Sequence, residues 1–267
     1  MTNTVSRKTS TATSPATLAG LIAIGHSALT GENSDPNHPH APVPANSWAT
    51  GTNPAVDSIY QRMLAQWPDT KGHVYNGAVG GATASALPGQ IESALLSVPA
   101  PRLVIIQTID NDLNCPIADS AFADFGASID TTLHTITQAS PRSQVLILLN
   151  HVSAAKDFQG DLDAAKADPK LIAQMTGPPP CGELDKTHHV QLASAKYLDA
   201  EVVSFNAEIL RVCAKYPTCV TTKGHENNFT LAPNGVNPNN DHLSVVGLAA
   251  MAKFYWPMAK AAILQGS

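Results

Sequence analysis

The stretch that decides the fold is Leu21-Ile22-Ala23-Ile24-Gly25-His26-Ser27, at positions 21–27. Its four consecutive apolar residues are typical of a strand buried on both faces, because a half-buried strand alternates apolar and polar residues. Glycine permits a tight turn directly after such a strand. In an open α/β sheet, ligands bind outside the carboxyl ends of the strands, which is where Ser27 stands. The pattern alone is weakly specific, since an ordinary serine in a turn fits it equally well.

Similar apolar runs recur along the chain, at 73–75, 103–106, 145–149 and 219–221. Amphipathic segments with the helical period of apolar residues lie between or after them, at 55–66, 122–138, 199–215 and 245–264. Pro54 precedes the first predicted helix, where a helix start tolerates proline, and Pro257 is a candidate break in the last. Strands that alternate with helices predict a doubly wound, parallel sheet.

Two segments interrupt this alternation, 31–53 and 153–197. The first has many Pro, Asn, His and Ser residues, and the second contains Pro178-Pro179-Pro180. We expect both to be long loops of the kind that form lids or binding sites. Residues 1–17 are rich in Ser and Thr and lack the apolar core of a signal peptide, so we expect a disordered N-terminal segment followed by a single domain over 18–267.

The composition argues against two classes of partner. The 16 Lys and Arg against 21 Asp and Glu give a net charge of -5, so a nucleic-acid partner is not expected. No apolar stretch reaches the roughly 18–20 residues of a membrane span, so no transmembrane segment is expected. Charged residues make up only 14% of the chain, which is common in secreted proteins. We expect a secreted or extracytoplasmic protein whose signal peptide is absent from this sequence, with a cytoplasmic location as the alternative. The oligomeric state leaves no signal in the sequence.

The four cysteines are Cys115, Cys181, Cys213 and Cys219, and none belongs to a CxxC pair. A zinc ribbon or thioredoxin motif is therefore not indicated, and two disulfides are the preferred interpretation. Cys213 and Cys219 are close enough in sequence to join a helix end to the next strand, which leaves Cys115 for Cys181. Three pairings are formally possible, and four free thiols in a cytoplasmic protein are the alternative.

Polar blocks follow the later strands in an order that suggests chemistry. The block from Asn76 to Thr83 follows the second strand, and Asn111-Asp112 follows the third. Asp241-His242 stands just before the last helix. Since the carboxyl ends of parallel strands meet at one edge, these groups can converge on Ser27. A nucleophile, a base and hydrogen-bond donors at one edge are what acyl transfer requires.

The ordered set of blocks resembles the SGNH/GDSL hydrolase family, over almost all of the chain after Thr17. Gly25-His26-Ser27 matches the family's Gly-Asp-Ser except at its middle residue, and Gly81 falls on the glycine five residues after the Asn of the second block. Asn111-Asp112 match the end of Gly-x-Asn-Asp, and His242 matches the histidine of Asp-x-x-His. The resemblance implies a three-layer α/β/α sandwich with a parallel sheet of about five strands.

The resemblance also implies a function: hydrolysis of carboxylic esters in small-molecule or acylated substrates, without metal or organic cofactor. Ser27 would attack the ester carbonyl, and His242 would take its proton and return it to the leaving alcohol. The backbone N–H groups of Ser27 and Gly81 and the side-chain amide of Asn111 would bind the oxyanion.

The sequence departs from the family pattern at three positions. His26 replaces the aspartate of Gly-Asp-Ser, and Ile109 replaces the glycine of the third block. Asn239 stands where the triad aspartate belongs, and an amide cannot stabilise the imidazolium as a carboxylate does. Three options follow. Asp241 or a backbone group assists His242, Asn239 merely orients the ring, or the protein is a weakened enzyme.

Other readings of the chain stay open. A carbohydrate deacetylase or acyltransferase on the same scaffold is one alternative, and a catalytically weakened binding protein is another. His38-Pro39-His40 and His188-His189 are candidate metal ligands, but they lack matching carboxylate or Cys partners, so exposed loop histidines are the preferred interpretation. Trp48 belongs either to the core or to the wall of an acyl pocket.

Overall fold

The computed structural model describes residues 17–39, 41–165, 169–232, 234–237 and 242–266. The expected disordered segment thus lies, but for Thr17, outside the described residues. The strands form one parallel sheet, in the spatial order β2-β1-β3-β4-β5. Their bounds are β1 Leu21–Gly25, β2 Val74–Asn76, β3 Leu103–Gln107, β4 Gln144–Ile147 and β5 Cys219–Thr221. All five strands lie where the apolar runs predicted them.

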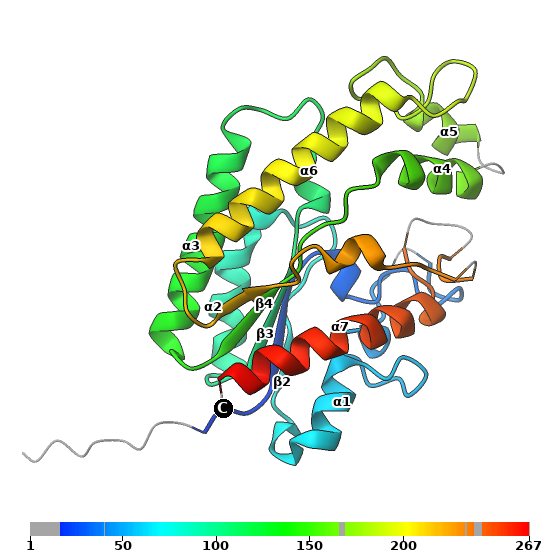
Figure 1. The fold of residues 1–267 in the computed structure, drawn as a ribbon. Helices are drawn as coiled ribbons and strands as arrows, with labels where there is room; N and C mark the ends of the chain where they lie inside the picture. The colour runs from blue at the N-terminus through cyan, green and yellow to red at the C-terminus, as the bar shows by residue number, and fades with distance from the viewer. Residues whose placement is uncertain (1–16, 40, 166–168, 233, 238–241, 267) are drawn as a thin grey trace, which may run out of the picture.

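Helices cover both faces of the sheet, which makes the three-layer α/β/α sandwich that the sequence predicted (Figure 1). One face carries α1 (Ile59–Gln66) and α7 (Val245–Gln265). The other carries α2 (Leu87–Ser97), α3 (Ala121–Ala139) and α6 (Leu192–Cys213).

Strand β1, which lies between β2 and β3, shows why its residues are apolar throughout. Leu21 and Ala23 pack into the core under α1 and α7, whereas Ile22 and Ile24 pack into the core under α2, α3 and α6. All four side chains are fully buried. Since successive side chains of a strand point to opposite faces, a strand between two helical layers needs apolar residues at every position.

Two predicted helices begin at other residues than expected. The first starts at Ile59 rather than at 55, because Ser58 caps it: Gln61 N–H donates to Ser58 Oγ, and Ser58 N–H donates to Gln61 Oε1. Helix α6 starts at Leu192, well before 199. Asp199 thus lies inside α6, and its carboxylate accepts from Ala154 N–H at 2.9 Å.

The segment 153–197 is not the long loop that we expected. It contains α4 (Ala154–Ala165), α5 (Pro169–Met175) and the first turns of α6. Helix α2 was also missed. The last helix runs unbroken through Pro257. Proline removes one helical hydrogen bond at a cost of about 3 kcal/mol, which the burial of Tyr255 and Ala259 on either side offsets. Over its described residues, segment 31–53 is a loop of turns with one 3₁₀ turn at Pro44–Asn46, as expected.

Two disulfides join the four cysteines in the preferred pairing. Cys115 bonds to Cys181 with a Cα–Cα distance of 5.4 Å, and Cys213 bonds to Cys219 with 5.3 Å. The second bridge ties the end of α6 to the start of β5, as predicted.

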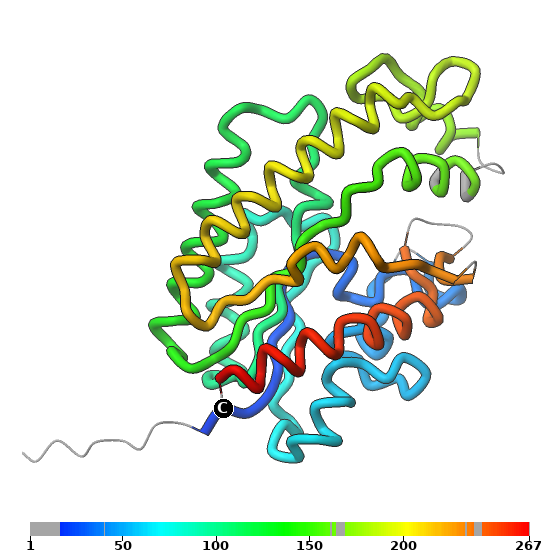
Figure 2. Tube along the Cα trace, viewed as in Figure 1, coloured from blue at the N-terminus to red at the C-terminus, as the bar shows by residue number. Residues whose placement is uncertain are grey.

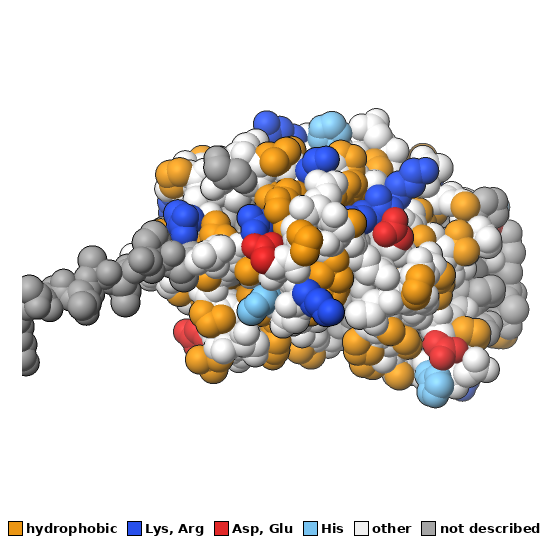
Figure 3. Space-filling model, turned by 90° about the horizontal axis from the view of Figure 1, so that it is seen from below, with side chains coloured by type: hydrophobic (Ala, Val, Ile, Leu, Met, Phe, Trp, Pro, Cys, Tyr) orange, Lys and Arg blue, Asp and Glu red, His pale blue; other side chains and the backbone are white. Residues whose placement is uncertain are grey.

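The surface seen from below in the view of Figure 1 carries scattered charges. Figure 3 shows Lys and Arg, Asp and Glu side chains lying among uncharged ones on this face. Within the described ranges, no helix combines the length and the apolar character that crossing a membrane requires.

Candidate functional site

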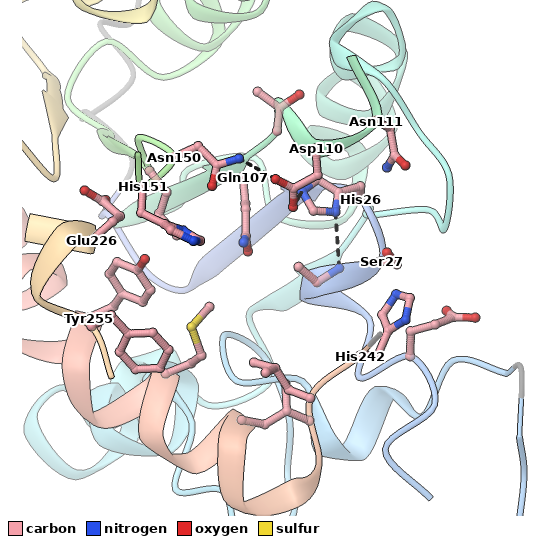
Figure 4. Close-up of a pocket in the computed structure, with 18 of the residues that line it drawn as sticks. His26, Ser27, Gln107, Asp110, Asn111, Asn150, His151, Glu226, His242 and Tyr255 are labelled. Carbon is pink, nitrogen blue, oxygen red and sulfur yellow. Dashed lines mark hydrogen bonds and ion pairs between the residues drawn. The ribbon is translucent and has the colours of Figure 1, made fainter. Parts of the chain in front are cut away.

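A cavity of about 630 Å³ opens at the carboxyl ends of β1, β3 and β4. In a parallel sheet of this order, the winding reverses between β1 and β3, and ligands bind at that point. The cavity brings together the residues that the sequence blocks predicted on the described part of the chain: Ser27, Gly81, Asn111 and His242 (Figure 4). Asn239 and Asp241 lie outside the described residues.

Ser27 opens a 3₁₀ turn (Ser27–Leu29) directly after β1. The turn depends on Gly25, whose φ is 141° and whose added Cβ would lie 1.8 Å from the carbonyl oxygen of Gln107. The buried side chain of Gln90 also holds the backbone of Gly25 in place. Its Oε1 accepts from Gly25 N–H at 2.8 Å, and its Nε2 donates to Gly25 O at 2.9 Å. Sequence reasoning missed Gln90, because nothing local marks a glutamine in a helix as a partner of a turn.

His26 takes over a capping role at this turn. Its side chain is buried, and its Nδ1 accepts from Ala28 N–H at 3.3 Å. Its Nε2 lies 3.2 Å from Asp110 Oδ2. An aspartate in this position can cap the turn with a carboxylate oxygen. The imidazole supplies an acceptor in the same place, so the departure from Gly-Asp-Ser leaves the turn capped.

The second block is held against the turn by Asn76. Its Nδ2 donates to Leu29 O at 2.8 Å and to Thr50 Oγ1 at 2.9 Å, while its Oδ1 accepts from Ala78 N–H at 3.1 Å. The loop then reaches Gly81, which has φ 75° and lies at the cavity wall. The N–H groups of Ser27 and Gly81 have no hydrogen-bond acceptor among the described residues. Both are therefore available to a ligand.

The third block contains the most strained residue of the site. Ile109 has φ 95°, at the position where the family pattern has glycine, and its side chain is fully buried. Asp112 stabilises the bend by accepting from Ala84 N–H and Thr108 Oγ1, both at 3.0 Å, and burial raises the pKa of Asp112. Asn111 uses one amide hydrogen on Ala82 O at 3.1 Å, which leaves the other for a ligand.

His242 lies beside an asparagine that sequence reasoning missed. Asn33 Nδ2 is 3.4 Å from His242 Nδ1, and Asn33 is buried with φ 57°. Asn237 Nδ2 donates to the carbonyl of Asn33 at 2.7 Å. Figure 2 shows how the loop after β1 (blue) meets the segment between β5 and α7 (orange) at this place. The sequence alone could not reveal this pair, because 209 residues separate Asn33 from His242.

A second group of polar side chains lies at the other end of the cavity, away from Ser27 and His242 (Figure 4). Burial raises the pKa of Glu226 to about 7, and burial also raises the pKa of Tyr255. A hydrogen bond to Asp157 raises the pKa of His151. None of these residues was predicted, because charged and aromatic residues in a polar stretch normally indicate solvent exposure or core packing.

The remaining candidates from the sequence lie elsewhere. Trp48 is fully buried in the core and contacts the Tyr255 ring with a centroid distance of 5.1 Å. His38 pairs with Asp35, and His189 with Asp185. Across the described ranges, no group of three or more metal-ligating side chains is found.

Comparisons with known proteins agree with this architecture. No family model and no curated protein matches the sequence. Among solved structures, TesA has a TM-score of 0.55 and 14% identity, covering 91% of this chain and 99% of its own. A protein from Parabacteroides merdae classed as a GDSL-like lipase has a TM-score of 0.54 and 14% identity, with coverages of 93% and 100%. The acetyl xylan esterase AlAXEase has a TM-score of 0.51 and 12% identity, with coverages of 90% and 98%. The chain therefore has the fold of the SGNH/GDSL hydrolases, as its sequence blocks predicted.

Proposed function

We propose that this protein is a serine esterase that hydrolyses carboxylic esters, with Ser27 as nucleophile and His242 as general base. The observation that carries the proposal is the convergence of four distant sequence blocks on one cavity, at the edge of the sheet where the winding reverses. The fold supports the same class of chemistry by analogy, because the solved neighbours include a lipase-like protein and an acetyl xylan esterase.

In this proposal, Ser27 Oγ attacks the ester carbonyl while His242 takes its proton, and the imidazolium then protonates the leaving alcohol. Water then attacks the acyl-enzyme in the same way: His242 takes the proton of the water, and the imidazolium returns it to Ser27 Oγ as the acid leaves. The oxyanion accepts hydrogen bonds from the N–H groups of Ser27 and Gly81 and from the amide of Asn111. The N–H groups of Ser27 and Gly81 support this role, because neither donates to a described residue and both residues line the cavity.

We further propose that Asn33 orients His242. An asparagine side chain presents either its N–H₂ or its carbonyl oxygen to Nδ1 after a half-turn of the amide. With the oxygen facing the ring, Nδ1 would keep a proton and Nε2 would be the nitrogen that accepts the proton of Ser27. Asn33 thus joins Asn239, Asp241 and a backbone group as a candidate partner of the base. An amide orients the ring but adds no negative charge, so a lower rate than in an aspartate-containing triad is expected.

The test is the variant Ser27→Ala on a p-nitrophenyl butyrate assay. Its kcat should fall by at least about 1,000-fold, as removal of a triad member does. The exposed Ser93→Ala on α2 is the matched control and should keep the parent rate. Retained activity in the Ser27 variant would refute the assignment. A folded parent without turnover would favour the weakened binding protein, and transfer to added alcohols in preference to water would favour an acyltransferase.

We also propose an extracytoplasmic location. Two disulfides support it, because such bonds persist in oxidising compartments and are rare in the cytosol.

A further inference from the structure

Glu226 is a buried carboxyl group that the chemistry at Ser27 does not use. Only 5% of the residue is exposed, yet it lines the cavity. Neither carboxyl oxygen has a hydrogen-bond partner among the described residues. The nearby backbone N–H groups of Glu226 and Leu149 lower the pKa of this carboxyl, although the Leu149 N–H donates to Thr222 Oγ1, at 3.0 Å. A buried polar group without a partner is costly, so a carboxyl kept in this state points to a ligand rather than to a structural role.

The surroundings of Glu226 favour its neutral form. Burial raises its pKa to about 7, so the carboxyl holds its proton through the mildly acidic range and is about half ionised at neutrality. The charged groups that face this end of the cavity are His151, whose Nε2 lies 3.0 Å from Asp157, and Asp110. The Tyr255 hydroxyl also lies here and makes no hydrogen bond to the described residues.

Apolar side chains also line the cavity, among them Leu149, Leu248, Met251 and Phe229. The cavity thus has polar groups at both ends and a mixed lining, since Gln107 and Asn150 lie between the two ends (Figure 4). Its volume of about 630 Å³ falls within the range of small-molecule sites, roughly 300–1,000 Å³. One end fits the ester group, and the apolar part of the lining fits a short carbon chain. The far end then needs a group that both donates and accepts hydrogen bonds, as a protonated carboxyl and a phenol do.

We propose that Glu226 and Tyr255 form a subsite for an alcoholic hydroxyl, so that the preferred substrates are esters with a hydroxyl group remote from the scissile bond. The inference rests on the proposed esterase function at Ser27. A hydroxyl matches a protonated carboxyl in both directions, whereas an ammonium group would require the ionised form and a purely apolar chain would leave both side chains unpaired. The hydroxyl can belong to the acyl part or to the alcohol part of the ester.

The experiment measures binding to the Ser27→Ala protein, so that turnover is not needed. Two matched pairs are titrated by calorimetry: methyl hexanoate with its ω-hydroxy derivative, and hexyl acetate with its ω-hydroxy derivative. In one pair, the hydroxylated ligand should bind about 10- to 100-fold more tightly, as expected for two net hydrogen bonds in a partly desolvated site. The pair that responds identifies the part of the ester that reaches the subsite.

Variants of Glu226 test whether this residue causes the preference for hydroxylated ligands. In a Ser27→Ala background, Glu226→Leu should reduce the affinity ratio to about 1, since leucine offers no hydrogen bond. Glu226→Gln, which keeps the shape and both hydrogen-bonding functions, should retain most of the ratio. The matched control is Glu32→Gln, a carboxylate that lines the cavity near Gly80 and should leave the ratio at the parent value.

Two results would overturn the subsite. The first is equal binding of both members of each pair, and the second is tighter binding of the ω-amino ligands than of the ω-hydroxy ligands. Failure of the esterase proposal looks different. A protein that prefers hydroxylated ligands but hydrolyses no ester would retain the subsite and lose the catalytic assignment, whereas turnover without a preference would do the opposite.

Discussion

Replacing Gly25 with alanine should destabilise the fold strongly, because the new Cβ has no room. It would lie 1.8 Å from the carbonyl oxygen of Gln107, a backbone atom of β3 that cannot rotate away. Overpacking of this kind costs about 1–3 kcal/mol or more, and a non-glycine residue in the left-handed region adds about 1–2 kcal/mol. Separating β1 from β3 also strains the two hydrogen bonds from Gln90, at about 1 kcal/mol each. We expect a total loss of about 4–7 kcal/mol.

The matched control is Gly72→Ala. Its φ of 81° also lies in the left-handed region, but an added Cβ meets no atom within 4 Å. It should cost only about 1 kcal/mol, since the backbone strain is partly offset by a less flexible unfolded chain. Urea unfolding followed by tryptophan fluorescence, with the disulfides intact, measures both variants. A difference of less than about 1 kcal/mol between them would refute the steric argument for the turn before Ser27.

Three further predictions concern charge, pH and cross-links. Asn33→Asp should raise kcat/KM on a short-chain ester by about 10-fold. The reason is that a carboxylate 3.4 Å from His242 Nδ1 attracts the imidazolium by roughly 5 kcal/mol, before the cost of desolvating the carboxylate is subtracted. A lower kcat/KM would exclude Asn33 as the partner of the ring. Stability should fall as pH rises from 4.5 toward about 7, since folded Glu226 holds its proton over a range in which the unfolded side chain has lost it. Glu226→Gln should flatten that slope in urea unfolding across pH. Removing the Cys115–Cys181 bridge by double serine substitution should lower the free energy of unfolding by about 4 kcal/mol, and removing Cys213–Cys219 by about 2 kcal/mol. The difference arises because the two bridges close loops of 66 and 6 residues. Equal decreases in the urea midpoint would contradict the chain-entropy argument.

The sheet could be predicted from the sequence because its strands are buried on both faces. A run such as 21–24 or 103–106 is apolar at every position, and this signal does not depend on distant residues. The helices of segment 153–197 gave a much weaker signal. Helix α4 buries Ala154 and Phe158 in a small cluster of their own, so its sequence lacks the broad apolar stripe of a helix on the main core.

The residues of the candidate site also fall into two groups, those that the sequence pattern indicated and those that only the structure revealed. Ser27 and His242 stand in short blocks at the ends of strands or at the start of a helix, so their order along the chain was informative. The roles proposed for Asn33, Gln90 and Glu226 depend on burial and on neighbours, present or absent, that only the folded chain determines. A glutamine in a helix or a glutamate in a polar stretch has an ordinary local sequence, and its significance comes from burial and from the partner that it has or lacks.

The stretch between β5 and α7 carries both Glu226 and His242. It is anchored at its far end by Ser244, which caps α7 and donates to Asn234 O at 2.7 Å, and it touches the loop after β1 through Asn237. If the proposals hold, the group that selects the substrate and the group that moves the proton are inherited together on one short piece of chain. Exchanging this piece between proteins of the same fold would transplant selectivity and base as a unit, while the sheet and the turn at Ser27 stay in place.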